Sequence, residues 1–250
     1  MATAIEEIKA PPRSVEDRER DYFTREEFWL IKDALPDLKL ELIFGQLIVK
    51  PEQGRDYFMI PEFELVADLF PDHRLELING EIVMSPPPDR RHQKHAGRLI
   101  TLLGFRAAQI VELGCQIGGA NYFFEVPEEI GEKLAALGLE SPTDVCPDVS
   151  VSFTDYLDTD RIPPALLVVE VLSDSSQKHV FRDMTTKPEI YAALKIPGYW
   201  IVDRRTNTVW VHTQPGKSGY VLRQQFSGDE FLPAPGLEFL QITPAQIFKE

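Results

Sequence analysis

Hydrophobic and polar positions alternate in several short runs of the chain and recur at helical spacing in others. The runs "RLELI" and "EIVMS" alternate on either side of Asn79-Gly80, and Asn-Gly between two such runs is a strong signal for a β-hairpin. The segment 92–113 instead places apolar residues at helical spacing, and Gly114 can end a helix there. The pattern therefore predicts a hairpin followed by a helix.

The second half of the chain continues this alternation of element types. The run "ALLVVEVL" predicts a strand that is covered on both faces. Segment 183–198 predicts a helix that Thr185 or Thr186 caps and Gly198 ends. Further strands are predicted over 118–127 and in a hairpin around 205–207, with a short helix over 243–250. This order of elements is typical of an α/β or α+β fold with a mixed sheet.

The first third of the chain contains a repeat. Residues 22–55 align without a gap with residues 57–90, each residue matching the one 35 positions later. The run Leu40–Ile43 recurs as Leu75–Ile78 and is followed each time by a glycine. Two copies are too few for a solenoid. The sequence therefore predicts a tandem duplication of one helix-plus-hairpin unit.

Length and charge narrow the class of protein. The 250 residues predict one large domain with an elaboration, or two small ones. A net charge of −14 argues against a nonspecific nucleic-acid binder, whose affinity comes from neutralising phosphates. No apolar run approaches the ~20 residues that span a bilayer. The charged segment 1–20 predicts a disordered leader without a signal peptide, and two cysteines make neither a disulfide framework nor a zinc site. We expect a cytoplasmic protein with no membrane partner.

Two carboxylates interrupt apolar strands. Asp148 lies in "VCPDVSVSF" and Glu170 in "LLVVEVL". A buried carboxylate is costly unless hydrogen bonds, a basic partner or a metal compensates it. Two acids from adjacent strands, with no histidine or cysteine cluster, suit a hard cation such as Mg²⁺. Such a cation can polarise a phosphoryl oxygen and activate water, and a nearby lysine would offset charge in the transition state.

The two acids and two further candidates, Lys187 and Glu76, also have structural interpretations. Asp148 fits a Pro-Asp turn at a strand end. Glu170 fits a buried ion pair with Arg182, and Lys187 fits an ordinary surface lysine. Glu76, in the second hairpin, fits a cross-strand charge pair.

The motifs in order resemble a known family. "RLELINGEIVMSPPPDRRHQ", "CPDVSV", "LLVVEVLSDSS", "RDMTTKPEIY" and "PGYWIVD" follow one another as in the Uma2 family of endonucleases, within the PD-(D/E)xK restriction-endonuclease-like superfamily. The resemblance covers about residues 57–212. It implies a restriction-endonuclease-like α/β (α+β) core with a central mixed β-sheet flanked by helices, here residues 57–250. Residues 21–56 would then be an accessory copy of the repeat, at a sheet edge or an interface.

The resemblance also implies roles for single residues. Asp148 and Glu170 would be metal ligands for Mg²⁺ (or Mn²⁺). The superfamily's lysine usually lies two residues after the second acid, where this chain has Leu172. The Uma2 pattern places the lysine in the following helix, at Lys187, which here precedes Pro188.

Further residues complete the predicted site. Glu76 is implied as an additional catalytic acid near the metal, and Asp183, four residues before Lys187, can form an i,i+4 salt bridge with it. The segment "RRHQKHAGR" is the most basic of the chain. Its predicted nucleic-acid-binding residues are Arg90, Arg91, His92, Lys94 and Arg98. His92 is also compatible with a plain position at the start of a helix.

These observations predict a metal-dependent endonuclease that hydrolyses phosphodiester bonds in DNA, and the resemblance implies a homodimer. One alternative is a catalytically weak or inactive member of the fold that acts as a binding or interaction module, which the net charge and Pro188 favour. Another is a phosphoesterase acting on a small nucleotide, which would show a closed pocket. The interaction module would show Lys187 pointing away from Glu170.

Overall fold

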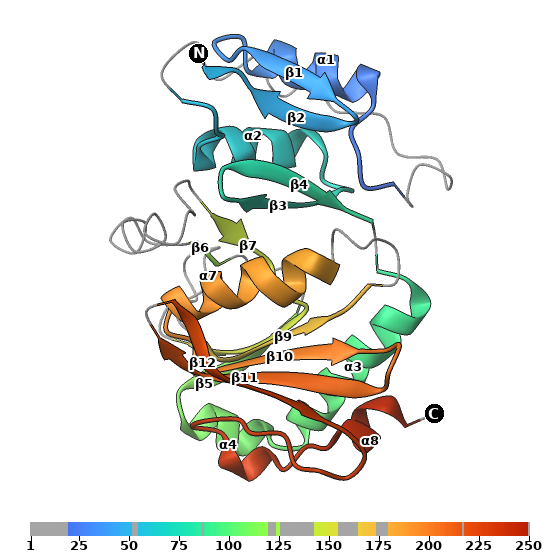
Figure 1. Cartoon of the computed structure of the whole chain (residues 1–250), viewed down its shortest axis with the longest axis vertical. Helices are drawn as coiled ribbons and strands as arrows, with labels where there is room; N and C mark the ends of the chain where they lie inside the picture. Colours follow the sequence, from blue (N-terminus) through green and yellow to red (C-terminus); the bar gives the residue numbers. More distant parts are fainter. Residues whose placement is uncertain are drawn as a thin grey trace. The chain divides into compact units, whose positions relative to one another are not determined.

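The computed structural model divides the chain into two compact units (Figure 1). The first comprises residues 1–87 and 138–145, and the second comprises residues 88–137 and 146–250. The described residues are 20–51, 55–86, 88–119, 124–125, 143–154, 165–173, 180–216 and 218–249. The predicted leader lies outside these ranges except for Arg20, and the predicted division of the chain at residues 56 and 57 stays a prediction.

The first unit contains the repeat as two copies of one structure. The first copy consists of α1 (Arg25–Ala34), β1 (Leu40–Ile43) and β2 (Gln46–Val49). The second consists of α2 (Ile60–Leu69), β3 (Arg74–Ile78) and β4 (Glu81–Ser85). The two helices begin and end 35 positions apart, and both hairpins are antiparallel. The predicted duplication of a helix-plus-hairpin unit is confirmed.

Both copies start their helices in the same way. The Glu27 carboxylate accepts a hydrogen bond from the Thr24 N–H at 2.8 Å, and that of Glu62 accepts one from the Met59 N–H at 2.8 Å. An arginine seven residues before each glutamate donates to the same carboxylate. These contacts satisfy backbone N–H groups that a helix start leaves without intrahelical partners.

Both hairpins turn on two residues with positive φ. Asn79 and Gly80 have φ values of 51° and 69°, and Phe44 and Gly45 have 49° and 78°. Two-residue turns of this kind need positive φ at both positions. A Cβ atom at Gly45 would lie 2.4 Å from the Cβ of Tyr22, so this position also needs glycine for space.

The second unit is built on a mixed sheet of six strands in the order β12-β11-β10-β9-β8-β5. Strands β9 and β10 are parallel, and the other neighbours are antiparallel. The strands are β5 (Cys115–Gly119), β8 (Val149–Phe153), β9 (Ala165–Val171), β10 (Gly198–Asp203), β11 (Thr208–Gly216) and β12 (Gly219–Phe226). The predicted mixed sheet and the hairpin around 205–207 are confirmed.

Helices cover both faces of this sheet (Figure 1). On one face lie α3 (Arg90–Gly104), α4 (Ala107–Glu112) and α8 (Pro244–Phe248), with the short helix η4 (Glu238–Leu240) in the C-terminal segment. The other face carries α7 (Lys187–Ala193). Leu167, Val169 and Val171 join the core on the α3 side, so the alternate residue Glu170 faces α7. Coverage on both faces explains why β9 is apolar at every position except Glu170.

Three predicted elements differ in detail. The helix predicted over 92–113 is two helices, because the chain breaks at residues 105–106 between α3 and α4. The helix predicted over 183–198 is preceded by a widened turn, η3 (Arg182–Thr186), so Thr186 lies at the N-cap position of α7 but its side chain makes no capping hydrogen bond. This helix ends at Ala193, five residues before the predicted Gly198. Lys195, just after the helix, has the left-handed φ of 62°. Of the strand predicted over 118–127, residues 118–119 belong to β5 and residues 124–125 form β6 (Phe124–Glu125). The other residues of this prediction lie outside the described ranges.

Candidate functional site

The strand register places the two predicted acids side by side. Val149 of β8 lies opposite Val169 of β9 in an antiparallel pair. Asp148 and Glu170 are the next residues on each strand, and residues opposite one another share a face of the sheet. Their exposed fractions are 3% and 2%. Two carboxylates are therefore buried next to each other on the α7 face.

Asp148 is held by groups from two other elements. Its Oδ2 accepts a hydrogen bond from the Val171 N–H at 2.8 Å and lies 3.0 Å from the Nε2 of His92. His92 is in the first turn of α3, and its own N–H donates to Asp89 at 2.6 Å. The His92 ring is 5% exposed, and its Nδ1 has no hydrogen-bond partner among the described residues.

Glu170 is the acceptor for two side chains of α7. The Lys187 Nζ donates to Oε1 of Glu170 at 2.7 Å, and the Tyr191 hydroxyl donates to the same oxygen at 3.0 Å. Lys187 is 1% exposed. Positions four apart share one face of a helix, so Lys187 and Tyr191 can reach the same carboxylate. The structure thus directs the predicted lysine towards the second predicted acid.

A third acid reaches the same lysine. Asp183 Oδ1 lies 3.7 Å from Lys187 Nζ, which confirms the predicted i,i+4 salt bridge. Asp183 also accepts a hydrogen bond from the Arg182 Nε at 3.3 Å. The predicted structural partner of Glu170 was Arg182, and the structure shows a buried ion pair of Glu170 with Lys187.

Pro188 is accommodated by the widened turn before it. In η3 the Lys187 N–H donates to the Arg182 carbonyl, five residues back. The Asp183 carbonyl would take the next such bond, but Pro188 has no N–H to give. The Tyr199 hydroxyl donates to that carbonyl instead, at 2.9 Å. Burial and then the charges of Glu170 and Asp183 raise the pKa of Tyr199 well above its usual value, which keeps this hydroxyl protonated.

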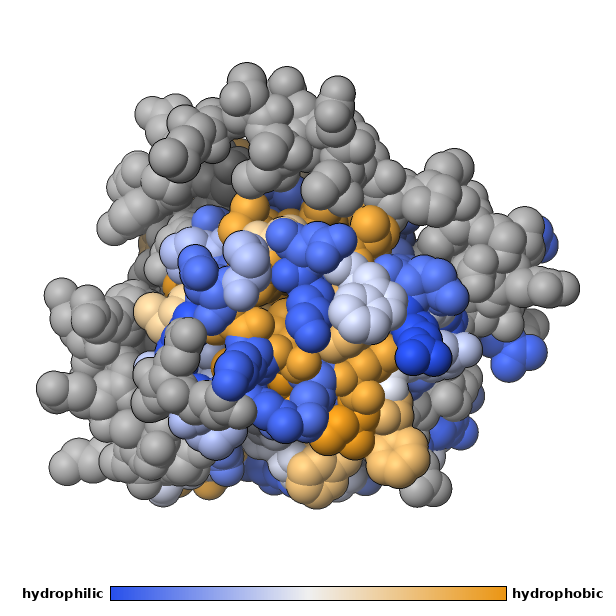
Figure 2. Space-filling model, turned by 90° about the horizontal axis from the view of Figure 1, so that it is seen from above, coloured by the Kyte–Doolittle hydropathy of each residue, from blue (hydrophilic) through white to orange (hydrophobic). Residues whose placement is uncertain are grey.

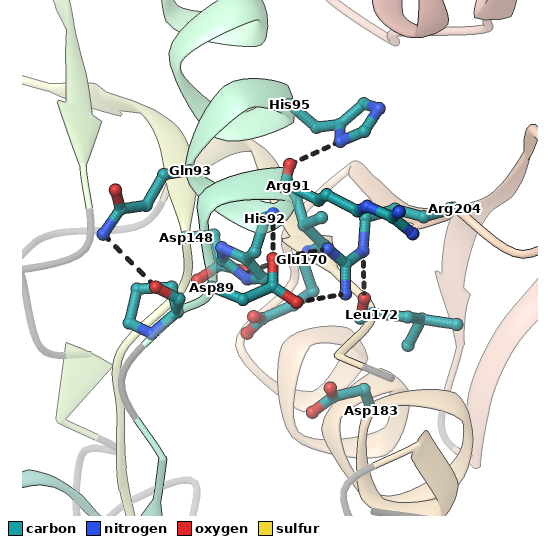
Figure 3. A network of polar contacts seen from close by, with 12 residues as sticks. Asp89, Arg91, His92, Gln93, His95, Asp148, Glu170, Leu172, Asp183 and Arg204 are labelled. Carbon is teal, nitrogen blue, oxygen red and sulfur yellow. Dashed lines mark hydrogen bonds and ion pairs between the residues drawn. The ribbon is translucent and has the colours of Figure 1, made fainter. Parts of the chain in front are cut away.

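Arg204 ties the start of α3 to the end of β9 (Figure 3). Its Nε donates to the Leu172 carbonyl at 2.9 Å, and its guanidinium pairs with Asp89 at 2.8 Å. The burial of Asp89 raises its pKa, but the bonds from Arg204 and the His92 N–H outweigh this and lower it. The helix that carries His92 is therefore fixed next to the strand that carries Glu170.

The predicted nucleic-acid-binding residues divide into three groups. Arg90, Arg91 and Lys94 are exposed in the first turns of α3. Arg98 donates to the Gln246 carbonyl of α8 at 3.1 Å. His92 is buried against Asp148 rather than exposed beside the arginines. Figure 3 shows Arg91 and His92 pointing in different directions from the same turn.

Glu76 lies in the first unit, on β3. It is completely buried, and the residue opposite it on β4 is Val83 rather than a basic side chain. Its counterpart Glu41 in the first copy is instead 44% exposed and pairs with Lys50. The sequence match between the two glutamates therefore does not extend to their surroundings.

The pair of strand acids fits Mg²⁺ by the chemistry of its donors. Mg²⁺ usually takes one or two carboxylates and keeps waters or substrate phosphates as its other ligands. Among the described residues, no three or more histidine, cysteine or acidic side chains are grouped to hold a metal. Asp148 and Glu170 alone supply the one or two carboxylates that Mg²⁺ usually takes from a protein.

The mixed sheet thus carries two adjacent acids on one face, with a lysine on the helix that covers that face. The family model Uma2, described as "Putative restriction endonuclease", matches residues 60–245, so the chain belongs to this family. The fold is similar to the crystal structure of a "putative nuclease belonging to DUF820" from Anabaena variabilis. That similarity has a TM-score of 0.52 and 18% identity, and covers 70% of this chain and 89% of the other. A comparison with curated proteins gave no match.

Sequence reasoning did not single out Tyr191 or Arg204. Tyr191 follows Lys187 by four residues, so its helical position was a usable signal. Arg204 lies in a turn between β10 and β11, and its partner Asp89 is 115 residues away. No local pattern in the sequence could indicate that contact.

Proposed function

We propose that the chain is a Mg²⁺-dependent (or Mn²⁺-dependent) endonuclease that hydrolyses phosphodiester bonds in DNA. The observation that carries the proposal is the burial of Lys187 against Glu170, on the strand next to Asp148. A lysine is rarely buried unless it is paired. If the chain were only an interaction module, we would expect Lys187 to point away from Glu170. The observed contact therefore favours the enzyme hypothesis.

Each residue has a distinct task in this proposal. Asp148 and Glu170 would hold the divalent ion, which would polarise the scissile phosphate. Lys187 would orient the attacking water and offset negative charge in the transition state, while Asp183, 3.7 Å from the Lys187 ammonium, would help to hold it in place. Tyr191 and His92 would fix the rotamers of Glu170 and Asp148. Glu76 remains a proposed additional acid.

The start of α3 supports a contact with DNA phosphates. Burial lowers the pKa of His95, and the positive charges of Arg204 and Lys94 lower it further, against the bond to the Arg91 carbonyl that raises it. Arg90, Arg91 and Lys94 are exposed together at this helix start, although the whole chain carries −14. We expect the double variant Arg91→Ala/Lys94→Ala to lower the salt-dependence slope of DNA binding by about two. An unchanged slope would remove this surface from the proposal.

The proposal extends to location and assembly. Cys115 and Cys146 are buried and no disulfide joins them, which is compatible with a reducing compartment such as the cytoplasm. No helix in the described ranges is both long and apolar enough to cross a membrane. The homodimer follows from the family resemblance.

Cleavage of supercoiled plasmid tests the proposed function. We expect nicking by the wild type in MgCl₂ or MnCl₂ and none in excess chelator. The Glu112→Gln variant, an exposed change on α4, serves as the control and should cleave like the wild type. If the wild type does not nick the plasmid and calorimetry detects no Mg²⁺ or Mn²⁺ binding, the endonuclease hypothesis is contradicted and the interaction-module hypothesis is favoured.

A further inference from the structure

A proline lies inside the helical stretch that carries the buried lysine. Residues 180–193 are helical without a break, through η3 and α7, and Pro188 is the second residue of α7. A proline inside a helix removes a backbone donor and crowds the carbonyl four residues earlier. In the widened turn of η3, residue 188 would be the donor to the Asp183 carbonyl, and proline cannot fill that role. The backbone next to Lys187 therefore needs a donor from elsewhere.

A buried tyrosine of the sheet supplies that donor. Tyr199 is the second residue of β10, and its hydroxyl donates to the Asp183 carbonyl at 2.9 Å. Tyr199 lies opposite Val168 of β9, so it is on the same face of the sheet as Glu170, under α7. Its side chain is 0% exposed, so water cannot easily replace the hydroxyl. Strand β10 is thus tied to the residue whose carboxylate lies 3.7 Å from the Lys187 ammonium.

A second tyrosine holds the other end of the same helix. Tyr220, the second residue of β12, donates its hydroxyl hydrogen to the Ile196 carbonyl at 2.8 Å, just after α7 ends. The ring centroids of Tyr199 and Tyr220 are 6.3 Å apart, and His212 of β11 packs against both rings. Two hydroxyls from the sheet thus bond the backbone on either side of α7.

The Tyr199 ring also packs against the helix residue that follows Lys187 by one turn. The ring centroids of Tyr199 and Tyr191 are 4.9 Å apart. The Tyr191 hydroxyl and the Lys187 ammonium both donate to Oε1 of Glu170. Burial raises the pKa of Tyr199 and of Tyr220, so both hydroxyls stay protonated and remain donors at neutral pH.

We propose that Tyr199 is a positioning residue for Lys187, and that Tyr220 assists it from the far end of α7. Tyr199 replaces the backbone donor that Pro188 lacks and thereby fixes the widened turn from which the lysine extends. The observation that carries this is the match between one missing N–H and one buried hydroxyl at the same carbonyl. The effect on cleavage rests on the proposed function, whereas the position of the ammonium does not.

Tyr199→Phe and Pro188→Ala, alone and combined, separate positioning from packing. Tyr199→Phe removes the donor to the Asp183 carbonyl and should slow Mg²⁺-dependent plasmid nicking by about ten-fold. Pro188→Ala restores an N–H that can donate to this carbonyl. In that background the tyrosine change should therefore slow nicking by less than about three-fold, since two changes that share one partner are not additive. An equal loss in both backgrounds would contradict the proposal and indicate that Tyr199 acts through packing.

The Lys187 ammonium gives a readout that needs neither metal nor cleavage. In protein with isotopically labelled lysine, NMR detects a buried ammonium whose protons exchange slowly, and Lys187→Met identifies its signal by the loss of it. We expect Tyr199→Phe to shift this signal, and the double variant to return it to that of Pro188→Ala. An unchanged signal in Tyr199→Phe would contradict the proposal. The expected shift in a protein that never nicks the plasmid would contradict the proposed function alone.

Tyr220→Phe tests the far end of the helix. It removes the donor to the Ile196 carbonyl and should slow nicking by about five-fold, less than Tyr199→Phe, because this carbonyl is further along the chain from the lysine. A larger loss and a larger ammonium shift than in Tyr199→Phe would contradict the leading role of Tyr199.

The matched control is a tyrosine on the surface. Apolar and hydrophilic side chains are mixed on the face of the molecule that Figure 2 shows. An exposed tyrosine can hydrogen-bond to water, so the loss of its hydroxyl changes little. Tyr22 of the first unit is 49% exposed, and Tyr22→Phe should match the wild type in both nicking and the ammonium signal. A shift in this control as large as in Tyr199→Phe would remove the support that the NMR measurement gives to the proposal.

Discussion

Buried acids occur in both units, but they are held in different ways. In the first unit, the buried Glu27 and the half-buried Glu62 each pair with an arginine seven residues earlier and accept the N–H at the start of their own helix. In the second unit, Asp148 and Glu170 come from two strands, and their partners come from α3 and α7. The arginine and N–H contacts of the first arrangement are local and occur in both copies, and the second arrangement is assembled from distant parts of the chain.

The difference agrees with a structural role for Glu27 and with the catalytic role that we propose for Asp148 and Glu170. Burial raises the pKa of Glu27, but the bonds from His73 and the Thr24 N–H and the charge of Arg20 outweigh it and lower the pKa to about 2. Its charge therefore stabilises the fold. In the second unit the charges of Asp148, Glu170 and Asp183 all raise the pKa of the neighbouring Tyr199, after its burial. Gathering like charges in this way is typical of functional sites.

The largest effect should come from removing one strand acid. We expect Glu170→Gln to slow plasmid cleavage by roughly 1,000-fold or more, because the metal loses a charged ligand. The amide oxygen can still accept from Lys187 and Tyr191, so the fold should persist. Single-turnover cleavage rates measure the loss. A rate within ten-fold of the wild type would contradict a catalytic role for Glu170.

Lys187→Met should act on both activity and stability. Cleavage should fall by about 100-fold, through loss of charge stabilisation in the transition state. Unfolding in urea should also become easier by roughly 3 kcal/mol, because Glu170 loses its buried cation. Lys187→Arg restores the charge but not the geometry, so it should recover more stability than cleavage. Full activity in the arginine variant would indicate that Lys187 acts through its charge alone.

Glu27→Gln should affect stability alone. A folded-state pKa of about 2 against an ordinary 4.5 corresponds to up to about 3 kcal/mol of unfolding free energy at neutral pH. Because the folded pKa is lowered, this stability is complete above pH 4.5 and is lost as the pH falls towards 2. The difference between wild type and variant in urea unfolding should shrink over that range, while plasmid cleavage at neutral pH stays unchanged. A constant difference down to pH 2 would refute the ion-pair account.

Tyr191→Phe should give the smallest effect. It removes one hydrogen bond to Glu170 and keeps the aromatic packing, so cleavage should slow by about five-fold. Lost cleavage with unchanged Mg²⁺ affinity would indicate that the hydroxyl acts on the reaction rather than on the position of the carboxylate. Calorimetric titration with MgCl₂ distinguishes the two.

The parts of the fold with a local or repeated signal could be predicted from the sequence. The duplication was readable because both copies keep their helix, turn and strand positions, and Asp148 and Glu170 were visible because each interrupts an apolar strand. The widened turn before Pro188 was not, because it depends on the Tyr199 hydroxyl reaching a carbonyl that proline leaves unpaired. The burial of His92 was also not predictable, since its position among basic residues indicated the surface.

The most direct test of the catalytic cluster is plasmid cleavage by Asp148→Asn, with its thermal unfolding measured in parallel. Asparagine can still accept the Val171 N–H, so the unfolding midpoint should stay within a few degrees of the wild type. Mg²⁺-dependent nicking should fall to the level seen in excess chelator. Nicking at the wild-type rate by this variant would contradict the assignment of Asp148 and Glu170 as the catalytic centre.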